Sequence, residues 1–429
     1  MDYSEALDRL YSSVPAFHAI GAGAYKPGLA TSRLLDDWAG NPHRSYATVH
    51  VAGTNGKGST SHTLAAILSA AGLRTGLYTS PHIFDFRERI RVDGLMISRE
   101  AVADFVERWL DWSKDHPEVK PSFFELTSTM ALEYFAAEKV DVAIIETGLG
   151  GRLDSTNIIT PQLSVITNIS LDHTAFLGNT LAEIAGEKAG IIKPGVPVVI
   201  GEHHPETDQV FIARAREVGA PITFAEPVAG EVRDTVNYYS KTPFGPMSGE
   251  LIGECQIRNA ATVFAAVKRL REHYDIPDSA VREGVGGVAR LTGLFGRWTT
   301  VASSPLTVVD TGHNEGGWRL IVDELTRVTH TPRHLVMGFV ADKDLSHILP
   351  LLEPLRGELT LWFSGPSCER GLPSTALQAR AAEYGFTGHA VADVNEAVSL
   401  ARAEAGPDGF VLVAGSNFLI ADLDINRLI

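Results

Sequence analysis

The sequence predicts an α/β fold in which a doubly wound, mostly parallel sheet is followed by a second, smaller α/β domain. Apolar runs of strand length alternate along the chain with segments whose apolar residues recur at helical spacing. In addition, an apolar strand, a glycine-rich turn and a helix follow one another at residues 51–60, VAGTNGKGST. Doubly wound sheets bind ligands at the carboxyl ends of their strands, so polar residues that follow the strands are candidate site residues.

The first strand is expected at residues 46–52, which are apolar and β-branched. After Lys57, apolar residues recur at helical spacing until Gly72 ends the helix. Thr180 and Glu183 form a capping box that begins a short helix ending near Lys188. The other elements expected in the first domain are strands at 75–80, 140–146, 163–169 and 196–201 and helices at 100–113 and 123–138.

A second series of strands follows the glycine-rich stretch at residues 283–298. We place the domain boundary near Leu294, which predicts domains at residues 1–294 and 295–429. The strands expected in the second domain lie at 306–310, 334–339, 358–363 and 410–415.

Composition indicates a soluble globular chain of two or three domains, because 44% of its 429 residues are hydrophobic and 21% are charged. The acidic N-terminus lacks a signal-peptide core and no apolar run approaches the ~20 residues that span a bilayer, so we expect a cytoplasmic protein. The two cysteines, Cys255 and Cys368, are too few for a disulfide framework or a cysteine zinc site. The formal charge of −15 disfavours nucleic acid and acidic membranes as partners and favours small molecules.

The glycine-rich turn has the composition of a phosphate-binding loop. Its backbone N–H groups can point at anionic oxygens with the dipole of the following helix behind them, and Lys57 can place a charge on a terminal phosphate. A nucleoside triphosphate fits such a site, and the density of glycine disfavours the alternative of a tight turn with incidental glycines. The residues assigned to the nucleotide are Gly53, Thr54, Asn55, Gly56, Lys57, Gly58 and Ser59.

The loop departs from the usual G-x-x-x-x-G-K-[ST] pattern, because two residues separate its first two glycines and Gly58 stands where a magnesium-binding hydroxyl would follow the lysine. A metal ion therefore needs other ligands. Glu146 ends a hydrophobic strand, and Ser80 and His173 follow two other strands, so the three are candidate ligands of one Mg²⁺ that bridges the phosphates. Taken singly, each has a structural explanation as a turn serine, a loop histidine or a capping carboxylate.

Several motifs occur along the chain in an order and spacing that resemble one known family: GTNGKGS, TSPH, ETGLGGRLDSTN, LDHT, EKAGI, GRW and DTGHN. The family is that of folylpolyglutamate synthase and dihydrofolate synthase, in the Mur ligase superfamily. The resemblance implies an ATP-dependent amide ligase with a Mur ligase-like P-loop domain and a Rossmann-like C-terminal domain. It also implies that Ser80, Glu146 and His173 hold Mg²⁺ and that Lys57, His173 and Lys188 are catalytic.

Lys188 is expected, from this resemblance, to be carbamylated and to help a second Mg²⁺. From the residues alone, a lysine near a helix end beside Glu187 is a solvated charge favoured by the helix dipole.

Further residues resemble the nucleotide contacts of the family. Arg297 and Asp310 resemble its hinge arginine and nucleotide-contacting aspartate, with His313 beside them, and Asn259 resembles its adenine-side asparagine. An interdomain salt bridge is the alternative for Arg297. Three departures from the family are mild: Trp298, Cys255 and Gly312 stand where phenylalanine, histidine and alanine are frequent.

The pterin-containing substrate is expected near Phe123 and Phe124, whose rings can stack on a pterin, and near the GGRLD loop with Arg152 and Asp154. One or both phenylalanines have helix core as the alternative. Asp154 and Phe124 resemble the arrangement in bacterial enzymes that also act on dihydropteroate. We therefore expect a monomeric, bifunctional enzyme acting on dihydropteroate, reduced folates, L-glutamate and ATP, with a folylpolyglutamate synthase alone as the alternative.

The implied reaction converts the acceptor carboxylate into an acyl phosphate, which the amine of glutamate then attacks. Nucleotide on the first domain and amino acid on the second would meet when the domains close and exclude water. A Mur-type cell-wall ligase is disfavoured, because only ~45 residues precede the loop, short of an ordinary further domain. A non-catalytic nucleotide-binding module is disfavoured by the presence of Lys57, Glu146 and His173.

Overall fold

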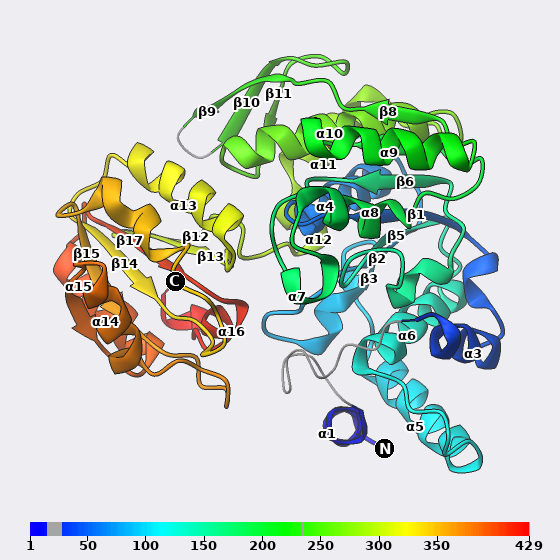
Figure 1. Ribbon diagram of the computed structural model, residues 1–429, viewed down its shortest axis with the longest axis horizontal. Coiled ribbons are helices and arrows are strands. Elements are labelled where there is room, and N and C mark those ends of the chain that lie inside the picture. The colour runs from blue at the N-terminus through cyan, green and yellow to red at the C-terminus, as the bar shows by residue number, and fades with distance from the viewer. Residues whose placement is uncertain (15–27, 234–235, 429) are drawn as a thin grey trace. The chain divides into compact units, whose positions relative to one another are not determined.

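The computed structural model describes residues 1–14, 28–233 and 236–428. The chain divides into two compact units, Met1–Leu294 and Phe295–Ile429, called here the N-terminal and C-terminal units (Figure 1). No helix within the described ranges is long and apolar enough to cross a membrane.

A large sheet forms the centre of the N-terminal unit. Its strands are β1 (Ala47–Ala52), β2 (Thr75–Tyr78), β3 (Ile90–Val92), β4 (Leu95–Met96), β5 (Val142–Glu146), β6 (Leu163–Ile166), β7 (Val198–Ile200) and β8 (Ile222–Phe224). They lie in the order β4-β3-β2-β5-β1-β6-β7-β8. Neighbours from β2 through β8 are parallel, whereas β3 is antiparallel to both β2 and β4. The prediction of a mostly parallel sheet is therefore confirmed.

Helices cover both faces of this sheet (Figure 1). They are α1 (Tyr3–Ser13), α3 (Ala30–Trp38), α4 (Lys57–Ala70), α5 (Arg99–Asp115), α6 (Phe123–Ala137), α7 (Thr174–Leu177), α8 (Leu181–Ala189), α9 (Pro205–Glu217), α10 (Glu254–Leu270), α11 (Asp278–Gly286) and α12 (Val288–Thr292). Ile144 of β5 enters a hydrophobic core with α4, α10 and α11, while its neighbours Ala143 and Ile145 enter another with α5 and α6. This alternation is what a doubly wound sheet requires, because successive strand residues face opposite sides.

Several short strands were not predicted from the sequence. A small antiparallel sheet, in the order β11-β10-β9, consists of β9 (Ala229–Arg233), β10 (Val236–Lys241) and β11 (Met247–Gly249). In β9 half-buried residues alternate with exposed ones and none is fully buried, so no apolar run marks it. The strand predicted at 163–169 ends earlier, at Ile166, because the following residues turn to hold the phosphate loop; Thr167 Oγ1 donates to the Asn55 carbonyl at 2.6 Å.

The C-terminal unit contains its own sheet, in the order β12-β13-β17-β14-β15-β16. Its strands are β12 (Thr299–Ser303), β13 (Leu306–Asp310), β14 (Arg333–Met337), β15 (Leu359–Phe363), β16 (Gly388–Ala390) and β17 (Phe410–Ala414), and its helices are α13 (Glu315–Arg327), α14 (Ser374–Glu383), α15 (Val394–Ala405) and α16 (Asn417–Ala421). All neighbouring pairs are parallel except β12 with β13. The four predicted strands are the four central ones, so the second α/β domain is confirmed as well.

Candidate active site

Strand register brings the sequence motifs to one edge of the sheet in the N-terminal unit. Val51 of β1 lies beside Glu146 of β5, Tyr78 of β2 lies beside Ile145, and Ala52 lies beside Ile166 of β6. The chain segments that leave these four adjacent parallel strands carry the phosphate loop, the TSPH motif, the ETGLGGRLDSTN motif and the LDHT motif. The carboxyl edge of β2-β5-β1-β6 is therefore the candidate site, as the doubly wound fold predicts.

Two glycines of the phosphate loop occupy positions that exclude a side chain. Gly53 has a φ of 153°, and a Cβ there would lie 1.9 Å from Thr167 Oγ1. Gly56, at the N-terminus of α4, has a φ of 81°, and a Cβ would lie 2.3 Å from Asn259 Oδ1. Because Gly56 caps α4 without a side chain, the N-terminus of the helix stays open to an anion.

The loop is held by the segment that follows β6. Thr54 N–H donates to the Asn168 carbonyl at 2.7 Å, and Thr54 Oγ1 donates to the Ser170 carbonyl at 3.1 Å. Asn55 Nδ2 donates to Ser170 Oγ at 3.0 Å. The N–H of Thr54 is thus engaged within the protein, so Thr54 shapes the loop and leaves anion binding to the N–H groups that follow it.

Two lysines meet at the start of this loop. Lys57 Nζ donates to the carbonyls of Gly53 at 2.9 Å and Thr54 at 3.2 Å, and Lys188 Nζ donates to the same Gly53 carbonyl at 2.9 Å. Lys188 is 3% exposed, so the alternative of a solvated charge is wrong. Burial, reinforced by the charge of Lys57, lowers the pKa of Lys188 to about 7.

Local sequence explains how Lys188 reaches that carbonyl. The predicted capping box is present: Thr180 accepts a hydrogen bond from Glu183 N–H, and the Glu183 carboxylate accepts one from Thr180 N–H. The box begins α8, which places Lys188 in its last turn. Glu187, the residue before, accepts from Arg152 Nη2 at 2.8 Å and so faces the loop at residues 147–154 instead.

The three candidate metal ligands lie in the segments that leave this edge. Glu146 is 3% exposed at the end of β5, and Ser80 follows β2 by two residues. His173 is the residue before α7, with a φ of 48° and a side chain that is 37% exposed. No group of three or more His, Cys, Asp or Glu side chains within the described ranges is arranged to hold a metal ion. A carboxylate, a hydroxyl and an imidazole nevertheless form a donor set that suits Mg²⁺, which binds few protein ligands and completes its shell with water and phosphate oxygens.

The loop at residues 147–154 is organised by Asp154. Its Oδ2 accepts from the N–H groups of Gly148 and Leu149, both at 2.8 Å, and its Oδ1 accepts from the N–H of Thr156 at 3.0 Å and from Thr156 Oγ1 at 2.5 Å. A carboxylate has about four acceptor positions, and these donors fill them. In this structure a pterin N–H that donates to Asp154 would have to displace one of them. Burial raises the pKa of Asp154, and the four donors oppose this rise.

The two phenylalanines differ. Phe123 is 4% exposed and stacks on Tyr11, with ring centroids 5.3 Å apart, so the helix-core alternative describes it. Phe124 is half-buried, packs against Tyr78 at 5.7 Å, and would contact a Cβ at Gly148. Phe124 is therefore the ring of the pair that borders the loop at residues 147–154.

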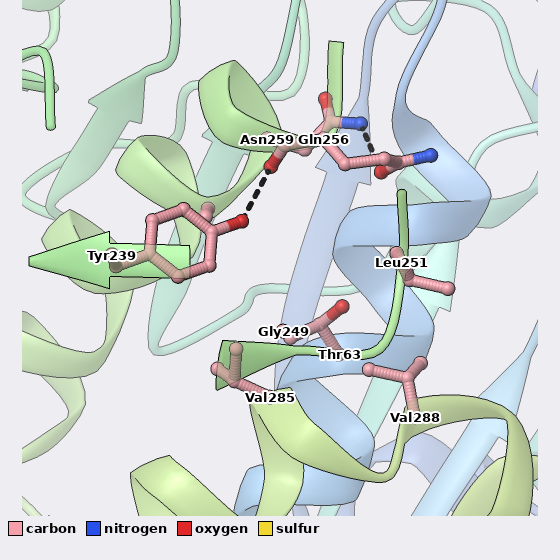
Figure 2. A pocket seen from close by; sticks show the side chains of 9 residues that line it. Thr63, Tyr239, Gly249, Leu251, Gln256, Asn259, Val285 and Val288 are labelled. Atoms are coloured by element: carbon pink, nitrogen blue, oxygen red, sulfur yellow. Dashed lines mark hydrogen bonds between the residues drawn. The ribbon is translucent and has the colours of Figure 1, made fainter. Parts of the chain in front are cut away.

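Asn259 lines a small pocket (Figure 2). The pocket lies near the phosphate loop, because Asn259 Oδ1 is the atom that a Cβ at Gly56 would meet. Asn259 Nδ2 donates to Gln256 Oε1 at 2.9 Å, and Tyr239 O–H donates to the Gln256 carbonyl at 3.4 Å. The cavity volume is about 20 Å³, and its apolar walls come from Leu251, Val285 and Val288 among others. Asn259 was predicted as a nucleotide contact from its motif, whereas Gln256 and Tyr239 were not predicted. Tyr239 lies in the small sheet, which no apolar run marks.

The predicted nucleotide contacts of the C-terminal unit cluster at the carboxyl end of β13. Asp310 accepts from Trp298 N–H at 2.8 Å and from Gly312 N–H at 2.7 Å. Burial raises the pKa of Asp310, against the opposing charge of Arg297. His313 Nδ1 lies 3.1 Å from the Thr311 carbonyl. Asp310, the first residue of the DTGHN motif, thus binds the main chain of the GRW motif. Both motifs lie far from the other motifs along the chain.

Two family models match this chain, the Mur ligase middle domain over residues 51–267 and the Mur ligase, glutamate ligase domain over residues 296–417. The chain is 34% identical to the dihydrofolate synthase/folylpolyglutamate synthase of Bacillus subtilis over 93% of its own length and 94% of that protein. It is 33% identical, over 98% of its length, to a probable bifunctional folylpolyglutamate synthase/dihydropteroate synthase of Haloferax volcanii, of which it spans 50%.

Solved structures agree with these relatives. Mycobacterium tuberculosis folylpolyglutamate synthase complexed with ADP has a TM-score of 0.86 and 29% identity, with 98% of this chain and 96% of that chain covered. Escherichia coli FolC in complex with DHPP and ADP has a TM-score of 0.83 and 29% identity, with the same coverage of both chains.

Proposed function

Since the chain belongs to the Mur ligase family, among the dihydrofolate synthases/folylpolyglutamate synthases, we propose that it is an ATP-dependent ligase that adds L-glutamate to reduced folates and to dihydropteroate. The observation that carries this proposal is the meeting of the open N-terminus of α4, Lys57, Lys188 and Glu146 at one sheet edge. Such an edge supplies N–H donors, cations and a buried carboxylate to a nucleoside triphosphate and a metal ion.

The reaction follows from the chemistry of amide formation. An oxygen of the acceptor carboxylate attacks the terminal phosphorus of ATP, the bond to ADP breaks, and an acyl phosphate results. The amine of glutamate then attacks the acyl carbon, loses a proton, and inorganic phosphate leaves. Lys57 and the N–H groups at the start of α4 stabilise the charge on the transferred phosphoryl group.

Magnesium fits the donors at this edge, with Ser80, Glu146 and His173 as its protein ligands. Bound there, Mg²⁺ would neutralise charge on the phosphates. The pKa of about 7 keeps a large share of Lys188 neutral near neutral pH, and a neutral amine is the form that reacts with carbon dioxide. We therefore keep carbamylation of Lys188, and its help to a second Mg²⁺, as part of the proposal.

The two units divide the substrates. The N-terminal unit binds ATP and the pterin-containing acceptor, with Phe124 and Arg152 beside the acceptor, and the C-terminal unit serves glutamate addition. The match of residues 296–417 to a glutamate ligase domain supports that division. Asn259, with Gln256, borders a pocket next to the phosphate loop and suits the amino and ring nitrogens of adenine. The C-terminal unit also contributes proposed nucleotide contacts, from Arg297, Asp310 and His313, so the division applies to the acceptor and glutamate and not to ATP.

One assay tests the function. ATP turnover is measured with dihydropteroate or tetrahydrofolate as acceptor, each with and without glutamate, and products are identified by mass spectrometry. Both activities predict phosphate release that depends on acceptor and glutamate together, and a product heavier by one glutamyl group in each case. Turnover with tetrahydrofolate alone would leave a folylpolyglutamate synthase, and turnover with neither would contradict the proposal. Size-exclusion chromatography tests the predicted monomer.

A further inference from the structure

A buried histidine stands on the strand that leads into the phosphate loop. His50 lies on β1, three residues before Gly53, and is 0% exposed. Its Nε2 is 2.9 Å from Thr156 Oγ1. Burial, followed by the charge of Lys193, lowers the pKa of His50 to about 3, so the ring is neutral at physiological pH.

The protons of this contact can be assigned by counting donors. Thr156 has one hydroxyl proton, and its Oγ1 donates that proton to Asp154 Oδ1. Thr156 Oγ1 must therefore accept from His50, which means that the proton of the neutral ring is on Nε2. The direction of donation thus runs from His50 to Thr156 and from Thr156 to Asp154.

Asp154 extends this series of hydrogen bonds to the main chain of the loop at residues 147–154. Its other oxygen, Oδ2, accepts from the N–H groups of Gly148 and Leu149. These two residues follow Glu146 by two and three positions. Four side-chain and main-chain groups in series therefore connect the strand before the phosphate loop to the loop after the candidate metal ligand.

We propose that His50 and Thr156 are positioning residues that hold the loop at residues 147–154 in register with the phosphate loop, so that the acceptor carboxylate meets the terminal phosphate. This inference rests on the proposed ligase function. Neither residue touches the reacting atoms; both act through Asp154. Their loss should impair the use of the acceptor while leaving ATP binding intact, because a misplacement of the order of 1 Å costs up to ~100-fold in rate.

The test uses substitutions that remove a hydrogen-bonding group while keeping the volume of the side chain nearly constant. Thr156→Val removes the hydroxyl at nearly constant shape, and Thr156→Ser restores it. His50→Leu removes the Nε2 donor, and His50→Gln supplies an amide N–H with similar reach. The matched control is Thr307→Val in the C-terminal unit, a buried hydroxyl that likewise donates once, to the Pro305 carbonyl, and accepts once, from Arg402.

Steady-state kinetics give the first readout. For Thr156→Val and His50→Leu, kcat/KM for the acceptor should fall at least ~10-fold while KM for ATP changes less than ~2-fold, with most of the loss restored in Thr156→Ser and His50→Gln. Equal changes in the kinetic constants for the acceptor and for ATP would overturn the inference. So would a loss of kcat/KM for the acceptor no larger than that of Thr307→Val.

Hydrogen exchange of the peptide that carries Gly148 and Leu149 gives a second readout that needs no activity. Thr156→Val should raise its exchange rate relative to wild type, and Thr156→Ser should not. An unchanged exchange rate of this peptide in Thr156→Val would overturn the inference, whatever the turnover of the variant. A wild type that shows no acceptor-dependent turnover would overturn the proposed function. The exchange result would still decide whether the hydrogen bonds of His50, Thr156 and Asp154 hold the loop.

Discussion

Lys57 and Lys188 share one hydrogen-bond acceptor, because the Nζ atoms of both lie 2.9 Å from the carbonyl oxygen of Gly53. Two ammonium groups this close repel each other, and that repulsion adds to burial in lowering the pKa of Lys188. An anion bound at the loop would relieve the repulsion. While Lys188 is an unmodified, protonated amine, the pair therefore makes the phosphate loop more receptive to an anionic ligand than its glycines alone would.

Lys57→Ala should lower ligase turnover by at least ~100-fold, similar to the loss of one transition-state donor. The fold should survive, because the Lys57 side chain bonds only to carbonyls of its own loop among the hydrogen bonds described. Turnover and circular dichroism are compared with Lys268→Ala, an exposed lysine on α10. A folded variant with near-native turnover would refute the nucleotide assignment of this loop.

Lys188→Met should stabilise the protein more at low pH than at high pH. The unfolded lysine keeps its proton up to its ordinary pKa of 10.5, whereas the folded one loses it at about 7. Between these values the unfolded state binds more protons, so the free energy of unfolding of the wild type rises with pH, and the cost of burying the charge is greatest below pH 7. The gain from Lys188→Met should be larger at pH 6 than at pH 9 by roughly 2 to 3 kcal/mol. Denaturant unfolding at the two pH values, with Lys268→Met as control, measures it; an equal gain at both would mean an ordinary pKa for Lys188.

Carbamylation of Lys188 can be observed directly. Protein equilibrated with ¹³C-bicarbonate at pH 8 should show a carbamate resonance that is absent from Lys188→Met. The signal should weaken at pH 6, where protonation at a pKa of about 7 removes the reactive amine. A wild-type spectrum identical to that of Lys188→Met would exclude the modification.

Glu146→Gln keeps the volume of the side chain and removes its charge, so the rate should fall severely and more Mg²⁺ should be needed to saturate it. His173→Ala should behave similarly, while nucleotide affinity changes less in both variants. Magnesium titrations of activity measure these shifts, with the exposed Glu272→Gln as control. Unchanged titration curves in both variants would place the metal elsewhere.

Asp154→Ala should depress turnover with dihydropteroate and with tetrahydrofolate by similar factors. If Asp154 contacted the pterin directly, as the sequence predicts, the loss would be larger with dihydropteroate. Because Asp154 already accepts four hydrogen bonds from its own loop, its removal should disturb the loop for either substrate. The control is Asp393→Ala, which removes the N-cap of α15 in the C-terminal unit. A loss confined to dihydropteroate would restore the direct contact.

Local sequence patterns predicted those parts of the structure that local physics determines. The apolar run at 140–146, the capping box of Thr180 and Glu183 and the glycines around Lys57 each specify their own segment. The carboxyl-edge rule then placed Glu146 beside the phosphate loop, because parallel strands end together.

What the sequence could not predict depends on contacts between distant segments. Burial of Lys188 against Gly53 joins residues 135 positions apart, and the contact of His50 with Thr156 joins residues 106 positions apart. Phe123 and Phe124 are adjacent and chemically identical, yet only the packing of α6 decides which of them is core. Strands as short as those of β3, β4 and β8 carry too few residues for a period to show.

The start of α8 is set by its own residues, and Lys188 stands eight positions after Thr180. An α-helix turns by about 100° and rises about 1.5 Å for each residue. A single residue inserted between Glu183 and Lys188 would swing the ammonium group about a quarter turn away from Gly53 and leave the cap untouched. In this stretch, the number of residues is therefore under stricter constraint than their identity. Homologous chains should tolerate replacement of Ala182 and of the exposed Gly186, which take part in neither the capping box nor the bond to Gly53, and no change of length.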